Sequence, residues 1–425
     1  MKALNDNEIK VFESMPDHRA VSDSLEKAFC SGGLSEFRKF IFAANNSLER
    51  KHEGLAVLLR GNDGKIIVYK DNHKIWELSV SEKSKKKTVC KVSFDFNHAR
   101  YTKDWDAKYK KLHELGFSIG NRSKSEVLPS DIRIKIVRND KKEVTGGEIG
   151  MISCTKEYFS KDFVEESYKI IHGLVKDFFR SQSEDYFRKA VATDPKYKSV
   201  ENIKGAGANV FIEKRWQQRL LFQFQNMSNG CYAYDLEFSQ KYPDKKYVDK
   251  FAKTNGEEFA DVKAEEIKKK LGTNEPDMLA IRYEEGAPVA LVLLEVKSTK
   301  SACEGSSGIR EHMEGMKSYS EQAIFMRNRK RDAYVSLCQY HRMGIISENI
   351  SIKEIPEDLP VEKVVLLTNA NIPMEEGVRA PSSALDYYKD HKDDIFSWAK
   401  RYGCKVWITD SNYWDIDLKI EEVSI

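Results

Sequence analysis

The chain has 425 residues, a net charge of +3 and seven cysteines. This length exceeds the usual size of one domain, and the small net charge excludes a polyanion-binding surface spread over the whole protein. The cysteines lie apart without C-x-x-C spacing, which argues against a zinc ribbon and fits reduced thiols. The N-terminus is too polar for a signal peptide, and no apolar run approaches the ~20 residues that span a bilayer. We therefore expect a cytoplasmic protein with no membrane partner.

An N-terminal α+β domain is predicted over residues 1–181. Apolar residues recur at helical spacing between Ser24 and Ala44. A hairpin is expected next, because two apolar segments flank the turn Gly61–Gly64. Other segments alternate like strands or carry the apolar stripe of a helix: strands are predicted over 75–78, 89–96 and 132–136, and helices over 108–115 and 164–179.

Two polar segments of this half have alternative interpretations. The lysine cluster within Lys83–Lys87 is interpreted as a solvated turn, with a phosphate-contacting loop as the alternative. Residues 182–208 are polar and include Gly205 and Gly207, so they are predicted to form a domain linker. A phosphate cradle is disfavoured there, because no strand precedes these glycines and no G-K-[ST] follows them.

A second, α/β domain is predicted over residues 209–425. It begins with a helix over 209–224 whose apolar stripe includes Trp216. The elements expected after this helix are a strand over 232–238, a hairpin over 278–297, a helical region over 306–343, a strand over 361–368, a helix over 382–401 and a strand over 405–409. The resulting order is α-β-β-β-α-β with one further helix–strand unit.

The second hairpin strand is apolar from Pro288 to Leu294 and then carries charges at Glu295 and Lys297. Burying an unpaired charge is costly, so such groups are usually paired, solvated or bound to metal. Because side chains alternate along a strand, Glu295 and Lys297 share one face, and the hairpin brings Asp277 near Glu295. Two carboxylates beside a lysine predict a site for a hard divalent cation. The alternative is a structural ion-pair cluster.

Pro276-Asp277 followed by Glu295-Val296-Lys297, on two strands joined by a turn, resembles the signature of the PD-(D/E)XK nuclease superfamily. The predicted order of elements in the second half of the chain is also similar to that family's αβββαβ core. The resemblance implies a restriction-endonuclease-like fold with a mixed central sheet. It implies Asp277 and Glu295 as metal ligands, helped by the Val296 carbonyl, and Lys297 as the residue that positions the attacking water. The implied cofactor is Mg²⁺, with Mn²⁺ as a substitute.

Several further polar residues have two interpretations each. By the same resemblance, Glu213 on the first helix is a catalytic candidate, as an extra ligand or a water-positioning group. It is equally well interpreted as a surface glutamate paired with a nearby lysine or arginine. Asp235 and Glu237 are weaker candidates. His312 lies where the resemblance implies a polar group near the site, but a capping or packing role is favoured for it. A basic run is either a phosphate-binding patch or a solvated helix face, and it consists of Arg327, Arg329, Lys330 and Arg331.

The expected function is a Mg²⁺-dependent nuclease that hydrolyses phosphodiester bonds in DNA, with an N-terminal domain that senses, targets or regulates. This layout resembles prokaryotic restriction and anti-phage defence nucleases, among them the Shedu type. A ribonuclease on the same fold and a non-catalytic nucleic-acid-binding module remain alternatives. A small-molecule enzyme is disfavoured, because the sequence has no P-loop, dinucleotide fingerprint, G-x-S-x-G or H-E-x-x-H motif. Since cutting both strands commonly uses two sites, a homo-oligomer is expected.

Overall fold

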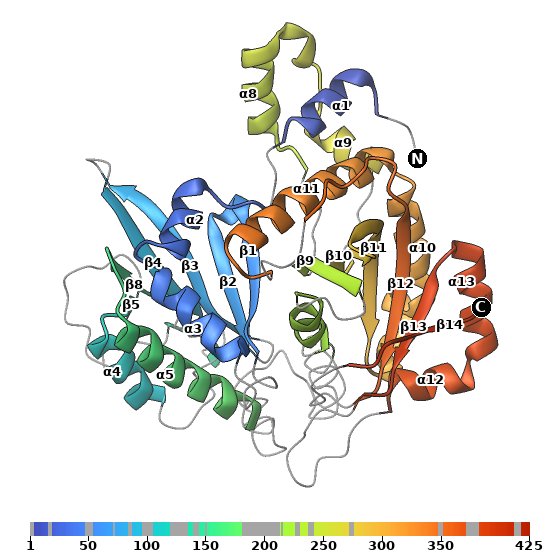
Figure 1. Ribbon diagram of the computed structural model, residues 1–425. Helices are drawn as coiled ribbons and strands as arrows, with labels where there is room; N and C mark the ends of the chain where they lie inside the picture. The colour runs from blue at the N-terminus through green and yellow to red at the C-terminus, as the bar shows by residue number, and fades with distance from the viewer. Residues whose placement is uncertain are drawn as a thin grey trace.

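The structure is a computed structural model with two six-stranded sheets flanked by helices, so the α/β class is confirmed (Figure 1). It describes residues 4–15, 19–46, 54–70, 73–83, 87–95, 105–119, 135–138, 144–148, 151–180, 213, 216–225, 230–236, 242–271, 276–346, 352–370, 382–411 and 418–425. The predicted linker at 182–208 lies outside these residues, as do Glu237 and, from the lysine cluster, Lys85 and Lys86.

The N-terminal sheet has the strand order β1-β2-β3-β4-β8-β5, and all its neighbouring strands are antiparallel. The predicted hairpin is confirmed, with Gly64 in the left-handed region at φ +60°. Strand β8 was not predicted. The strands are β1 (Ala56–Arg60), β2 (Lys65–Lys70), β3 (His73–Lys83), β4 (Lys87–Asp95), β5 (Ser118–Ile119) and β8 (Met151–Lys156), and a separate pair is formed by β6 (Lys135–Arg138) and β7 (Val144–Glu148).

Helices cover one face of this sheet (Figure 1). The helical region expected between Ser24 and Ala44 is two helices, separated by Ser31–Leu34. A Cβ atom at Gly33 would lie 2.1 Å from the carbonyl oxygen of Glu157, so only glycine fits. The aromatic ring of Phe37 packs edge-on against Trp76, with 4.9 Å between ring centroids. The helices are α2 (Asp23–Cys30), α3 (Ser35–Asn46), α4 (Trp105–Glu114) and α5 (Lys161–Arg180).

The C-terminal sheet is mixed and has the order β14-β13-β12-β11-β10-β9. Strands β9, β10 and β11 are antiparallel, β11, β12 and β13 are parallel, and β14 is antiparallel to β13. The predicted strands are confirmed, whereas β14 was not predicted. The strands are β9 (Cys231–Leu236), β10 (Met278–Glu284), β11 (Ala287–Lys297), β12 (Val361–Thr368), β13 (Lys405–Thr409) and β14 (Glu421–Val423).

Alternation along the strands gives this sheet two buried faces. Leu279, Leu291 and Leu293 lie in a core that also contains Met313 and Phe325 of the following helices. The residues between them, such as Ala280 and Val292, lie in a second core with Trp216. The helices of this half are α8 (Lys245–Asn255), α9 (Ala264–Leu271), α10 (Ile309–Ser320), α11 (Ala323–Arg342), α12 (Ala384–Asp390), α13 (Lys392–Tyr402) and a helix over 216–225, with short 3₁₀ turns η6 (Glu257–Phe259), η7 (Lys300–Cys303) and η8 (Gly305–Ser307).

The two sheets meet at their edge strands β1 and β9, and α11 crosses between them (Figure 1). The exposed edge of β1 is capped by side chains from the second half. Gln225 accepts from the N–H of Val57 at 3.3 Å and donates to its carbonyl at 2.5 Å. The hydroxyl of Tyr340 accepts from the N–H of Leu59 at 3.0 Å. These bonds satisfy backbone groups that an open strand edge would leave unpaired.

The N-terminal helix α1 (Asp6–Glu13) lies beside α11 rather than on the first sheet. The ring of Phe12 packs on Phe325 at 5.6 Å between centroids, and Asn7 donates to the carbonyl of Glu258 at 2.9 Å. Contacts therefore cross between the first residues and the second half of the chain. The division into domains at 1–181 and 209–425 stays a prediction.

Candidate active site

The hairpin of β10 and β11 sets Asp277 opposite Glu295. Met278 pairs with Leu294 at the open end of the hairpin, Asp277 comes just before this pair and Glu295 just after it. The turn is formed by Glu285 and Gly286, whose φ angles of +50° and +76° suit a tight hairpin. A bulge between Arg282 and Tyr283 then shifts the pairing by one residue, so that Asp277 comes opposite Glu295 and not Leu294. The predicted approach of the two carboxylates is therefore present in the structure.

The carboxylate of Asp277 is held by the backbone of the neighbouring strand. Its Oδ2 accepts a 2.7 Å hydrogen bond from the N–H of Val296. The N–H and C=O of one strand residue point to the same side. The carbonyl of Val296 therefore faces the side on which Asp277 lies, as the sequence-based ligand set requires.

Glu295 is almost fully buried, with 2% of its surface exposed, and its two oxygens have different surroundings. Oε1 lies 2.7 Å from Nζ of Lys297 and 3.0 Å from Nδ1 of His312. Oε2 is buried and has no hydrogen-bond partner among the described residues. A buried carboxylate oxygen without a partner is costly, so Oε2 is a ready acceptor for a cation.

The site accumulates negative charge, and the pKa values reflect this. Burial, followed by the nearby carboxylates of Glu295 and Glu213, raises the pKa of Asp277 well above its ordinary value. Burial also opposes ionisation of Glu295, but Lys297 and His312 outweigh it and lower the pKa of that carboxyl. The two carboxyls thus have opposite shifts, because the cationic and hydrogen-bonding partners favour Glu295.

Lys297 is buried with 3% of its surface exposed, yet it stays cationic. Burial alone would lower its pKa, and the carboxylates of Glu295, Glu213 and Asp277 together raise it above the ordinary lysine value. A protonated lysine is a hydrogen-bond donor and not a base. Lys297 can therefore orient a water molecule or a phosphate oxygen by donation.

Glu213 lies near Asp277, Glu295 and Lys297. It is helical and precedes the helix over 216–225 in the sequence. Its charge is among the causes that raise the pKa values of both Asp277 and Lys297. The structure therefore brings together all four residues predicted as catalytic from the sequence. Whether Glu213 takes part in catalysis stays a prediction.

His312 was not included among the predicted site residues, and the structure places its ring against Glu295. It lies in the first turn of α10, which packs on β11 and β12. The favoured sequence interpretation, a capping or packing histidine, therefore missed a contact to the site. No local sequence pattern predicts the contact of His312 with Glu295, because it depends on how α10 packs across the sheet.

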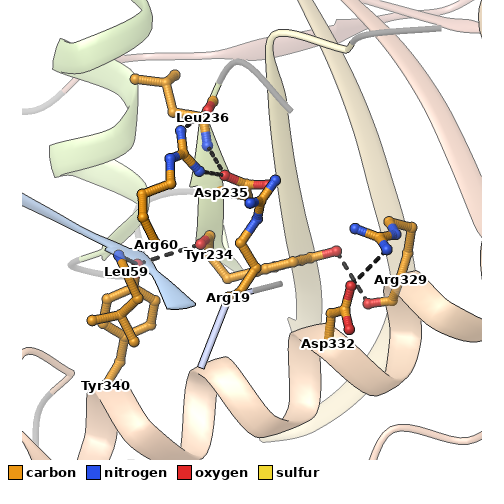
Figure 2. A network of polar contacts seen from close by, with 9 residues as sticks. All are labelled: Arg19, Leu59, Arg60, Tyr234, Asp235, Leu236, Arg329, Asp332 and Tyr340. Atoms are coloured by element: carbon orange, nitrogen blue, oxygen red, sulfur yellow. Dashed lines mark hydrogen bonds and ion pairs between the residues drawn. The ribbon is translucent and has the colours of Figure 1, made fainter. Parts of the chain in front are cut away.

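Asp235 lies at the interface of the two sheets, and Figure 2 shows its contacts. This fully buried carboxylate accepts from Nε of Arg19 at 2.5 Å and from Nη1 of Arg60. Arg60 also donates to the carbonyl oxygen of Leu236 at 2.5 Å. Because Arg60 ends β1 and Asp235 lies in β9, this group joins the two halves of the molecule. Asp235 is thus a structural residue in this arrangement.

The predicted basic patch does not form one exposed surface, and this corrects the sequence interpretation. Arg329 is 1% exposed and lies 2.7 Å from Asp332 (Figure 2), and Lys330 is 7% exposed and donates to the carbonyl of Glu357. The first residue of the run, Arg327, pairs with Glu13 of α1. Arg331 keeps an exposed position on α11. Arg329 and Lys330 are buried on α11, so these four residues do not share one exposed surface.

The carboxylates fit a Mg²⁺ ion, although they do not enclose one. Among the described residues, no three His, Cys, Asp or Glu side chains are arranged to hold a metal ion. Mg²⁺ usually takes one or two carboxylates and keeps several waters. Asp277, Oε2 of Glu295 and the carbonyl of Val296 supply such a set, and the mutual repulsion of the carboxylates favours a cation between them.

Comparisons of the chain with protein-family models, with curated proteins and with solved structures find no significant match. Of the helices in the described part of the chain, none is long and apolar enough to cross a membrane.

Proposed function

We propose that this protein is a metal-dependent nuclease that hydrolyses phosphodiester bonds, with DNA as its substrate and Mg²⁺ as its ion. The observation that carries the proposal is the unpartnered Oε2 of Glu295 beside Asp277, with Lys297 on the other oxygen. Two carboxylates, a charged lysine and a backbone carbonyl at one strand end suit hydrolysis of a phosphodiester.

Each residue of the site has a distinct role in this proposal. Asp277 and Glu295 would hold the ion together with the Val296 carbonyl. When bound, the ion would polarise the phosphate and lower the pKa of a bound water. Lys297 remains charged, so it donates a hydrogen bond to the attacking water or to a phosphate oxygen. Glu213 adds a carboxylate that can accept a hydrogen from the same water.

The order of elements supports the same proposal. The helix over 216–225 is followed by the antiparallel strands β9, β10 and β11, with α8 and α9 inserted between β9 and β10. These strands are followed by α10, α11 and β12, which is parallel to β11. This order is similar to the αβββαβ core of the PD-(D/E)XK nucleases, and the carboxylates lie at the equivalent strand ends. A restriction or anti-phage defence role, a homo-oligomeric state and a sensing role for the first sheet rest on that resemblance alone.

Cleavage assays with purified full-length protein test the proposal. We expect Mg²⁺ or Mn²⁺ to support cleavage of plasmid or linear DNA, and Asp277→Asn, Glu295→Gln and Lys297→Met each to lower the rate at least ~100-fold. Glu304→Gln, at an exposed residue after the same strand, is the matched control and should cleave normally. Unchanged cleavage by the Asp277 and Lys297 variants would overturn the proposal.

The substrate class is tested by parallel assays on single- and double-stranded DNA and RNA. Cleavage of DNA with Mg²⁺ is the expected result. Metal-dependent cleavage of RNA alone would establish the ribonuclease alternative. Salt-dependent DNA binding without cleavage at any metal concentration would establish the non-catalytic alternative.

A further inference from the structure

We propose that His312 is a positioning residue that fixes the carboxylate of Glu295 for metal binding, an inference that rests on the proposed function. His312 and Lys297 both bind Oε1, at 3.0 Å and 2.7 Å, and thereby leave Oε2 for the ion. His312 does not contact the reacting atoms in this account. It acts through Glu295.

The position of His312 is set by the way α10 begins. The backbone N–H of His312 donates to the carbonyl of Gly308 at 3.1 Å, closing the first turn of the helix. The neighbours Ile309 and Met313 are fully buried and anchor this turn on the sheet. The side chain of His312 is 26% exposed, whereas that of Glu295 is 2% exposed. The helix therefore presents a fixed ring to a buried carboxylate.

The chemistry of the contact fixes which ring nitrogen carries a hydrogen. An ionised carboxylate only accepts hydrogen bonds, so the contact to Oε1 requires a hydrogen on Nδ1 of His312. His312 lowers the pKa of Glu295 by this hydrogen bond, in the same direction as Lys297. Two donors on one oxygen hold the carboxylate plane more firmly than one flexible ammonium group does.

Partners that orient a metal ligand typically contribute 10–100-fold to metal affinity. Without His312, the Glu295 carboxylate can rotate until Lys297 bridges both oxygens, and Oε2 is then no longer reserved for the ion. We therefore expect removal of the His312 ring to weaken metal binding. The cleavage rate at saturating metal should fall by a smaller factor. A merely structural residue would change stability without this separation.

Substitutions at His312 can separate the Nδ1 hydrogen bond from packing. The amide nitrogen of asparagine lies where Nδ1 lies in histidine, so His312→Asn keeps a donor to Oε1. The amide nitrogen of glutamine lies near Nε2, so His312→Gln keeps volume and polarity but loses that donor. Glu311→Gln is the matched control, because Glu311 is the exposed neighbour on the same helix turn.

The experiment is a calorimetric titration of the full-length protein with Mn²⁺, together with cleavage rates over a range of Mn²⁺ concentrations. We expect His312→Gln and His312→Leu to weaken Mn²⁺ binding about 10–100-fold, with much of the cleavage rate recovered at saturating Mn²⁺. His312→Asn and Glu311→Gln should bind within a few-fold of the unsubstituted protein. If His312→Leu does not fold, the comparison of His312→Gln with His312→Asn gives the answer.

The outcomes distinguish this inference from the proposed function. Tight Mn²⁺ binding by the unsubstituted protein and by His312→Gln alike would overturn the positioning role and leave the proposed function standing. Equal losses in His312→Asn and His312→Gln would also overturn it, because the Nδ1 hydrogen bond would then not be the cause. If the unsubstituted protein binds no Mn²⁺ and cleaves nothing, both proposals fall.

Discussion

Oδ2 of Asp277 accepts a 2.7 Å hydrogen bond from the backbone N–H of Val296, so the carboxylate of one strand is docked on the backbone of the next. This bond is enough to orient Asp277 but not to offset the repulsion of its neighbours, because burial, Glu295 and Glu213 still raise its pKa. The hairpin thus holds a carboxylate where its charge is unfavourable without a cation. That combination is typical of functional sites that reduce stability.

We expect Asp277→Asn to stabilise the metal-free protein at neutral pH while it abolishes cleavage. The amide can still accept from the N–H of Val296 but carries no charge, so the repulsion disappears. A gain of about 0.5–2 kcal/mol in the free energy of unfolding is expected, measured by urea unfolding in EDTA. Asp249→Asn, at an exposed residue of α8, should leave the stability unchanged.

The same shift gives a pH dependence. The raised pKa of Asp277 means that the native state binds this proton more tightly than the unfolded state does. Its contribution to stability is therefore full below the ordinary carboxyl pKa and is lost as the pH rises through the raised value. The metal-free protein should lose stability over this range, and Asp277→Asn should not. If the stability of both proteins falls in parallel as the pH rises, Asp277 is not the group responsible for the loss.

The buried pair of Glu295 and Lys297 should show strong coupling. Lys297→Met leaves the buried Glu295 charge without its closest cation and should cost about 3–5 kcal/mol of unfolding free energy. The double variant Glu295→Gln/Lys297→Met should recover most of this loss, since replacing both charges of a buried pair is often nearly neutral. A urea-unfolding cycle over the four proteins measures the coupling. Additive effects would show that the pair does not interact as described.

Asp235 should matter for stability and not for the metal site. Asp235→Asn removes the carboxylate that Arg19 and Arg60 share, and we expect a loss of about 3–5 kcal/mol in unfolding free energy. The control is Glu165→Gln, because the exposed pair of Glu165 with Lys161 at 3.6 Å is worth only about 0.3–0.5 kcal/mol. Mn²⁺ binding by folded Asp235→Asn should be unchanged. If Asp235→Asn loses no more unfolding free energy than Glu165→Gln, Asp235 does not hold the two halves of the molecule together.

The hairpin and its carboxylates could be predicted from the sequence because the information is local. The two-residue period of a strand fixes which side chains share a face, and the turn at Glu285 and Gly286 brings the two strands together. The exact pairing of Asp277 with Glu295 also needs the one-residue bulge between Arg282 and Tyr283, which the sequence pattern does not predict. The same local reasoning yielded the N-terminal hairpin at Gly64.

The remainder could not be predicted, because it depends on how distant segments pack. Arg329 and Lys330 belong to a charged run that usually faces solvent, but α11 lies between the two halves and buries them. The partners of Asp235 come from the first 60 residues of the chain, and Glu295 meets His312 only because α10 returns over β11. In each case the residue type was visible in the sequence, and its tertiary neighbour was not.

The most direct test of the central claim is an anomalous difference map from a crystal of the full-length protein soaked with Mn²⁺. We expect a Mn²⁺ peak next to Asp277 and Oε2 of Glu295. The Val296 carbonyl should face the ion, and Lys297 should still contact Oε1. Mn²⁺ found only at other residues, in a protein that cleaves DNA with Mn²⁺, would contradict the account.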